Sequence, residues 1–268
     1  MRNKYLVGAT LALAFSLVAP VSALGSVTSQ KLTVDAAPSL QNAKKGKPGP
    51  VGINVTVDTF EAPPTPAAQT AQTTVLNFDP AFNLGNTARY PQCNPASLAN
   101  TTTDQAKILC APSQVGAGDS TVCSAAAGCG VVSLPGVVTA FNGVPSGGNP
   151  TIILHNRIGP PANATTILNG VLTGDTLTVA VPDTAATGLH LTHFFTAVPI
   201  TRTGVIKKKG KKGKKKQKPK KIFYITAKCL DKVWDFNETT FFRGGAPAQF
   251  SGTSQPCQQR KPKKKKKK

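Results

Sequence analysis

The stretch GINVTVDTF, residues 52–60, decides the fold class. Its apolar residues Ile53, Val55 and Val57 alternate with polar ones. Because successive side chains of a strand point to opposite faces of a sheet, a period of two buries one face of this segment and leaves the other in water. The stretch therefore predicts a strand of an antiparallel sheet.

Further segments of the same character follow along the chain, at 73–78, 151–157, 164–172, 175–182, 189–206 and 222–229. A helical pattern fits only residues 94–108, where an Asn or Ser cap would open one short helix. Short strands joined by turns favour an all-β fold, an antiparallel β-sandwich that is immunoglobulin-like in architecture. A true immunoglobulin domain is not expected, because Trp234 follows Cys229 by only five residues.

The beginning of the chain has the three parts of a secretory signal peptide. A basic start is followed by an apolar run to about residue 18, and Val21-Ser22-Ala23 is a small-residue cleavage pattern. We expect a cut after Ala23 and a secreted or cell-envelope-associated protein. The predicted order is a signal peptide (1–23), a flexible linker (24–50), the sandwich domain (51–258) and a disordered basic tail (259–268).

The positive charge is concentrated in short tracts. The chain has 32 basic and 11 acidic residues, a net charge of +21. Two basic residues lie in the signal peptide, three in 44–47, eleven in 207–221 and eight in 260–268, which leaves eight against eleven acidic residues for the body. The tracts hold no aromatic side chain that could stack on a base, so specific nucleic-acid recognition is not expected.

The longest tract, KKKGKKGKKKQKPKK at 207–221, is predicted to be a long hairpin loop inserted between two strands, because long surface loops cost little closure entropy. The candidate polyanion-binding residues are its lysines: Lys207, Lys208, Lys209, Lys211, Lys212, Lys214, Lys215, Lys216, Lys218, Lys220 and Lys221. The alternative is that the tract is solvated low-complexity sequence with no fixed partner.

Six cysteines in an exported chain indicate disulfides, and they allow fifteen connectivities. Proximity along the chain favours three pairs: Cys93–Cys110, Cys123–Cys129 and Cys229–Cys257. A metal centre is not expected, since the chain has no closely spaced Cys/His cluster and His190 and His193, three apart, should lie on opposite faces of a strand. No cofactor is expected either.

Catalytic signatures such as G-x-S-x-G and H-E-x-x-H are missing from the sequence. The densest acidic cluster, Asp231, Asp235 and Glu238 around Trp234, is compatible with a carboxylate pair for glycoside hydrolysis. The stronger interpretation is a strand in which the aromatic residues pack and the acids are solvated. The chain is therefore predicted not to be an enzyme.

The segments YPQCNPASL (90–98), ILCAPSQVGAG (108–118) and KCLDKVWDF (228–236), with a later CQQ (257–259), resemble a group of uncharacterised exported proteins of soil actinobacteria. The resemblance spans roughly residues 50–258 and implies a disulfide-bearing β-sandwich, often with Lys/Gly tracts in a late hairpin. It carries over no catalytic or binding residue. The chain departs from the group at Cys110-Ala111-Pro112, where proline is expected directly after the cysteine.

The leading functional hypothesis is an exported, non-enzymatic envelope protein whose lysine tracts tether it to anionic wall polymers or to a membrane surface. Each lysine near such a surface contributes on the order of 1 kcal/mol, and salt weakens the attraction. Two alternatives remain open at this point. One is nonspecific binding of nucleic acid or another polyanion by the tracts, and the other is an envelope glycan-acting enzyme.

Overall fold

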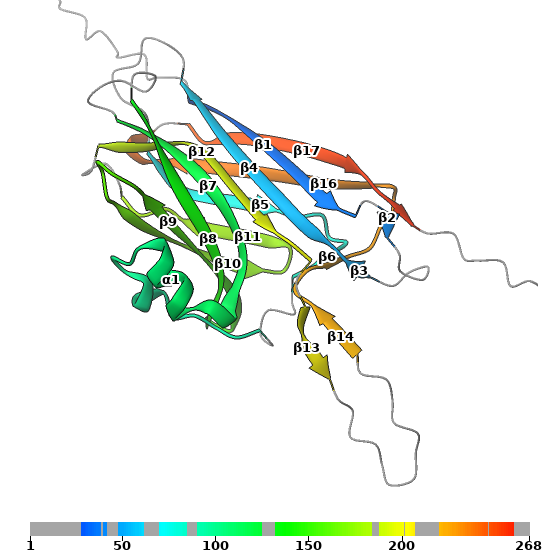
Figure 1. Ribbon diagram of the computed structural model, residues 1–268. Helices are drawn as coiled ribbons and strands as arrows, with labels where there is room; N and C mark the ends of the chain where they lie inside the picture. Colours follow the sequence, from blue (N-terminus) through cyan, green and yellow to red (C-terminus); the bar gives the residue numbers. More distant parts are fainter. Residues whose placement is uncertain are drawn as a thin grey trace, which may run out of the picture.

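The structure is a computed structural model, which describes residues 28–38, 40–41, 48–61, 70–84, 90–124, 132–183, 188–200, 202–206, 220–245 and 247–259. Eleven strands form one sheet in which all neighbours are antiparallel (Figure 1). In spatial order they are β1 (Thr28–Ala37), β4 (Gly52–Glu61), β12 (Leu189–Val198), β7 (Gln114–Ser124), β8 (Ser133–Ser146), β9 (Asn149–Ile158), β10 (Thr165–Thr173), β11 (Thr176–Ala180), β5 (Ala71–Asn77), β16 (Val233–Phe242) and β17 (Gln249–Pro256).

The sheet curls until its first and last strands lie side by side, so that it is nearly closed and barrel-like (Figure 1). Side chains of β17 join this seam to the backbone of β1. The Leu32 amide donates to Ser251 Oγ at 2.8 Å, and the Ala36 amide donates to Gln255 Oε1 at 2.6 Å. The Gln255 amide group donates in return to the Ala36 carbonyl at 2.9 Å. Side-chain hydrogen bonds therefore close the sheet where backbone pairing ends.

The predicted all-β, antiparallel fold is confirmed, but the strands form one nearly closed sheet rather than two separate sheets. Alternation along a strand predicts which face is buried and not which strands are neighbours. The order of the strands depends on pairing between segments that are far apart in the sequence, since β12 lies between β4 and β7.

The predicted linker at 24–50 is wrong for residues 28–37, which form β1. Leu32, Val34 and Ala36 alternate with polar residues and are buried, and Val34 lies opposite Val55 of β4. The period of two that identifies residues 52–60 as a strand therefore also applies to this segment.

A short helix covers part of the outer face of the sheet. Helix α1 (Thr103–Leu109) begins at Thr102 with a capping box to Gln105, and it follows the 3-10 turn η2 (Pro95–Leu98). Together they replace the single helix predicted at 94–108. Leu98 and Ala106 pack on Phe141 of β8 and Ile153 of β9 in a second, smaller core.

Aromatic residues fill one end of the space inside the sheet. The Phe82 ring lies 5.1 Å from Trp234 and 5.3 Å from Phe236, and Phe78 lies 6.3 Å from Phe236, between ring centroids. These edge-on contacts are favourable beyond the area that they bury. We call this region, defined by Phe78, Phe82, Trp234 and Phe236, the packed half of the interior.

The remaining elements are short. They are β2 (Leu40–Gln41), β3 (Gly49–Pro50), β6 (Phe82–Asn83), β13 (Arg202–Ile206), β14 (Lys220–Phe223), β15 (Thr226–Ala227), β18 (Gln258–Gln259), η3 (Ala111–Ser113) and η5 (Arg243–Gly245). The strands β13 and β14 pair with each other in a separate two-stranded sheet. In the part of the chain that the structure describes, no helix combines the length and the apolar character needed to span a membrane.

Candidate ligand-binding cavity

The other half of the interior is a cavity of about 430 Å³. It reaches the end of the sheet where β1 and β5 begin and where β4 and β11 end, since Gln30, Thr59, Thr70 and Val181 lie in its wall. A nearly closed sheet widens as strands are added, and about eight strands already leave room for one small ligand. Eleven strands therefore enclose space that their own side chains fill at one end only.

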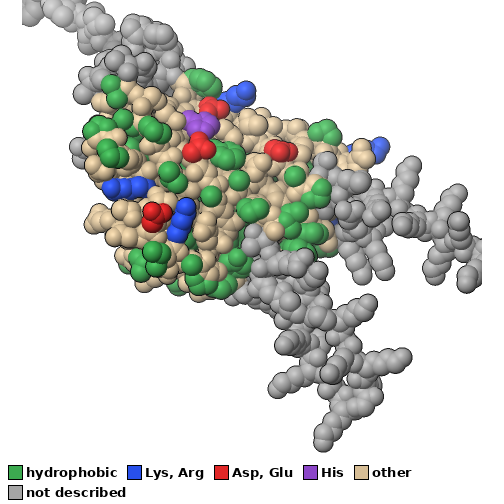
Figure 2. All heavy atoms as spheres, viewed as in Figure 1, with side chains coloured by type: hydrophobic (Ala, Val, Ile, Leu, Met, Phe, Trp, Pro, Cys, Tyr) green, Lys and Arg blue, Asp and Glu red, His purple; other side chains and the backbone are tan. Residues whose placement is uncertain are grey.

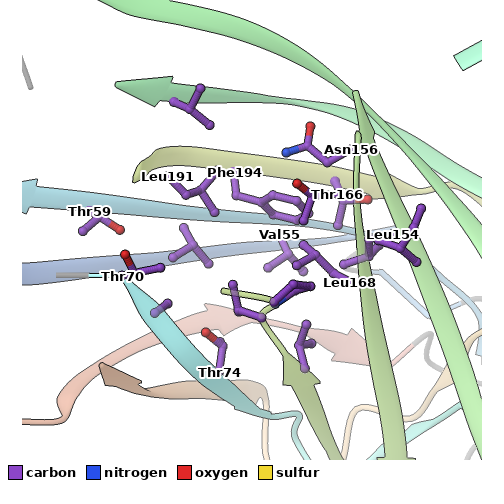
Figure 3. Close-up of a pocket in the computed structure, with 18 of the residues that line it drawn as sticks. Val55, Thr59, Thr70, Thr74, Leu154, Asn156, Thr166, Leu168, Leu191 and Phe194 are labelled. Carbon is purple, nitrogen blue, oxygen red and sulfur yellow. The ribbon is translucent and has the colours of Figure 1, made fainter. Parts of the chain in front are cut away.

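Most of the wall is aliphatic. Leu154 and Leu168 from β9 and β10 approach the cavity, while Val55, Leu191 and Phe194 approach from β4 and β12 (Figure 3). Leu76, Leu177 and Val179 contribute from β5 and β11. Threonine hydroxyls are spaced around this wall, among them those of Thr59, Thr70, Thr74 and Thr166 (Figure 3). Apolar walls with a few polar groups are typical of small-molecule sites, whose volumes range over roughly 300–1,000 Å³.

A hydrogen bond across β8 fixes one of the polar groups. Ser120 Oγ of β7 donates to Asn156 Oδ1 of β9 at 2.8 Å, and Asn156 lies in the cavity wall. Gly136 of β8 pairs with Ser120, and a Cβ at this glycine would clash with Ser120 Oγ. Because Gly136 has no side chain, Ser120 and Asn156 have room to form their hydrogen bond across β8.

The strand β16 runs through both halves of the interior with one buried row: Trp234, Phe236, Glu238, Thr240 and Phe242. The first two side chains belong to the packed half, whereas Glu238 and Phe242 lie in the cavity wall. Glu238 is fully buried, at 0% exposure. The row thus carries a carboxyl group into an otherwise apolar interior.

Hydrogen bonds satisfy only one oxygen of this carboxyl group. Thr240 Oγ1 donates to Glu238 Oε1 at 2.9 Å, and Thr74 Oγ1 lies 2.9 Å from Thr240 Oγ1. Glu238 Oε2 is buried without a hydrogen-bond partner. Burial raises the pKa of the Glu238 carboxyl, and the Thr240 hydroxyl opposes that shift in part. The interior therefore favours the neutral acid.

Two more buried polar atoms in the wall lack a partner. They are Thr196 Oγ1 of β12 and Gln30 Oε1 of β1. Buried polar groups in proteins are nearly always hydrogen-bonded, and water, an ion or a ligand accounts for many exceptions. Three such atoms in one wall indicate that the cavity is suited to a ligand with a few polar atoms.

The acidic cluster predicted around Trp234 does not assemble. Asp235 and Glu238 are three apart on β16, so that Glu238 lies inside while Asp235 accepts a hydrogen bond from exposed Ser254 at 2.6 Å. Asp231 precedes the strand and is exposed. The expectation that all three acids are solvated is also wrong for Glu238, because the alternation of β16 turns it inward.

Two of the three predicted disulfides are present. The Cα atoms are 5.5 Å apart in Cys93–Cys110 and 5.7 Å apart in Cys229–Cys257. Cys123 is also disulfide-bonded, and its predicted partner Cys129 lies outside the described residues. Disulfides of this kind are typical of extracellular proteins.

The histidines do not lie on opposite faces of β12, contrary to the prediction. The register of β12 shifts between Leu191 and His193, so that His190 pairs with Cys123 and His193 with Thr121, two positions apart on β7. Such a bulge adds one residue to the strand, so that His190 and His193 point to the same face of the sheet. His193 Nδ1 lies 2.6 Å from Asp58 Oδ1 at the surface. Within the described residues, no group of ligands suited to a metal ion is present.

The predicted polyanion-binding tract falls mostly outside the described residues, which include only the backbone of Lys220 and Lys221, in β14. The predicted disordered tail likewise lies outside them, apart from residue 259. On the face shown in Figure 2, charged side chains of the described body are few and scattered. That face carries no concentrated basic surface.

No known protein family, curated protein or solved structure matches the chain. The interpretation of the cavity as a candidate ligand site therefore depends on its geometry alone.

Proposed function

We propose that the protein is an exported, non-enzymatic binding protein that holds a small, mostly apolar molecule inside its sheet. The observation that carries the proposal is the aliphatic cavity of about 430 Å³ with a buried, half-satisfied carboxyl group in its wall. A ligand of this kind buries its apolar surface against Leu, Val and Phe side chains, and this burial is the main source of affinity in such sites.

The size of the cavity supports the same proposal. Sites for small molecules have volumes of roughly 300–1,000 Å³, and the volume of about 430 Å³ lies within that range. A ligand that binds only the folded protein also stabilises the fold.

The test is a titration of the purified protein with N-phenyl-1-naphthylamine, an uncharged fluorophore that brightens in apolar surroundings. We expect saturable binding by the wild type and a strong loss in Leu168→Trp, because the larger ring fills the cavity. The matched control is Thr178→Trp on the neighbouring strand β11, where the side chain is exposed. Equal binding by all three proteins would place the dye outside the cavity and refute the proposal.

The tethering hypothesis is a second proposal, and the position of the β13–β14 hairpin favours it. This hairpin projects from the sheet well away from the strand ends that the cavity reaches (Figure 1). Lysines between β13 and β14 would hold the protein to anionic wall polymers or headgroups without covering the cavity. The disulfides fit an extracellular location.

Salt-step fractionation of producing cells tests the tether. We expect retention of the full chain, release by salt, and no retention of a variant that lacks 207–221 and 260–268. Equal release of both forms into the medium would rule the tether out. Equal affinity of the tracts for DNA and for wall material would favour nonspecific polyanion binding instead.

A further inference from the structure

The chemistry of the cavity wall restricts the class of ligand, and this inference rests on the proposed function. We propose that the ligand is an uncharged, mostly aliphatic molecule with one oxygen acceptor, a ketone or an alcohol, and that Glu238 donates a hydrogen bond to this oxygen from Oε2. Three observations carry the proposal: the buried Glu238 oxygen that has no protein partner, the composition of the wall, and the groups that surround the carboxyl.

The hydrogen bonds at Glu238 leave one of its oxygens for a ligand. Thr240 Oγ1 donates to Glu238 Oε1, and Thr74 Oγ1 lies 2.9 Å from Thr240 Oγ1, where either hydroxyl can be the donor. In the proposed arrangement Thr240 keeps donating to Oε1, so that the proton of the neutral acid is on Oε2, the oxygen without a protein partner. A ligand that completes this site offers an acceptor.

The wall does not favour a charged ligand. None of its described residues is Lys, Arg or His, so that among them an anionic headgroup finds no cationic partner. An ammonium group would need Glu238 to ionise among aliphatic side chains, where the desolvation of both charges offsets their attraction. A neutral oxygen requires neither ion to be desolvated. The interior thus discriminates by polarity as well as by shape.

The described residues around Glu238 supply no charge that would change the effect of burial on its pKa. Its cross-strand neighbours are Leu76 of β5 and Ser251 of β17, neither of which titrates. Across the cavity, β4 and β12 present Val55, Phe194 and other uncharged residues. The only other ionisable residue of the described wall is Asp183, which is largely exposed and lies near Arg243. Among the described residues of the wall, no cation therefore favours the charged form of Glu238.

The experiment compares four ten-carbon probes as competitors of the fluorophore: 2-decanone, decane, decylammonium and decanoate. In the wild type we expect 2-decanone to bind about five- to tenfold more tightly than decane, the contribution of one buried hydrogen bond. Both charged probes should bind more weakly than 2-decanone. The preference for the ketone should decline as pH rises through the raised pKa of Glu238, because ionised Glu238 no longer donates.

Two variants separate the hydrogen bond from packing. Glu238→Gln keeps an acceptor for Thr240 and a donor for the ligand, so it should keep the ketone preference and lose its pH dependence. Glu238→Leu has no donor and should bind ketone and alkane alike. Retained ketone preference in Glu238→Leu, or tightest binding of decylammonium in the wild type, would overturn the ligand class. If neither decane nor the fluorophore binds any variant, the proposed function itself fails.

Discussion

The two halves of the interior meet along β16 and differ in how they are filled. At one end the rings of Phe78, Phe82, Trp234 and Phe236 pack against one another, and Phe78 borders the cavity. At the other end smaller Leu, Val and Thr side chains line a cavity of about 430 Å³. The curvature of the sheet therefore does not decide whether the interior is solid. The size of the inward-facing side chains does, and β16 shows the change from Trp and Phe to Glu and Thr within one strand.

The largest expected difference comes from the same substitution made in each half. Phe236→Ala in the packed half should lower the free energy of unfolding by about 3–5 kcal/mol, because it creates a new void among packed rings. Phe194→Ala in the cavity wall should cost only the lost burial, about 1.5–3 kcal/mol, because the void already exists. Urea unfolding of both variants measures the difference. Equal losses would mean that the two halves are packed alike.

Removing the disulfide that closes the packed half should have the next largest effect. Cys229→Ala with Cys257→Ala opens a link between residues 28 positions apart. The chain-entropy model assigns such a link about 3.5 kcal/mol. Thermal unfolding should show this loss while the fluorophore affinity of the folded protein stays near that of the wild type. A large loss of affinity in the folded double variant would show that the cavity depends on the packed half.

The protonation of Glu238 should make the stability of the unliganded protein depend on pH. Burial raises the folded-state pKa of Glu238. The contribution of this group to the free energy of unfolding is therefore fully present below the ordinary pKa of a glutamate, and it is lost as pH rises through the raised value. Glu238→Gln should remove this dependence, and at neutral pH Glu238→Leu should gain about 1–3 kcal/mol by eliminating an unpartnered buried group. Identical pH profiles for the wild type and Glu238→Gln, from urea unfolding across pH, would contradict a buried carboxyl.

The smallest expected effect concerns the seam between β1 and β17. Ser251→Ala leaves the Leu32 amide without its acceptor and should cost about 0.5–1.5 kcal/mol. The matched control is Ser254→Ala on the same strand, whose hydrogen bond to Asp235 is exposed and should matter by a few tenths of a kcal/mol. Thermal shifts of equal size in the two variants would show that the seam does not contribute to closure.

The sequence predicted the local structure well where alternation was regular. The strands predicted at 52–60, 151–157, 164–172 and 175–182 and two disulfide pairs are present. The predicted segment 189–206 is divided into β12 and β13, and 222–229 is divided between β14 and β15, so these two predictions are right only in part. The strand at 28–37 has the same alternation and was hidden by its position beside a Pro/Gly-bearing segment. The bulge in β12 changed the face of one histidine, and nothing in the residues of LHLTH marks the extra position.

The cavity was beyond prediction for a different reason. Whether Leu154, Leu177 and Phe194 surround a space depends on which strands become neighbours, and these three come from β9, β11 and β12. One signal was visible, because Glu238 occupies the same parity as Trp234, Phe236 and Phe242 in VWDFNETTFF. A carboxyl group in the apolar register of a strand indicates a polar group turned inward.

The most direct test of the account is a methyl NMR titration of Ile/Leu/Val-labelled protein with 2-decanone. We expect shifts of the methyl groups of Leu168, Val179 and Leu191 in the cavity wall. The methyl groups of Leu98, in the outer core under α1, and of exposed Val137 should not respond. Shifts confined to Leu98 and Val137, or none at saturating ligand, would contradict a ligand held inside the sheet.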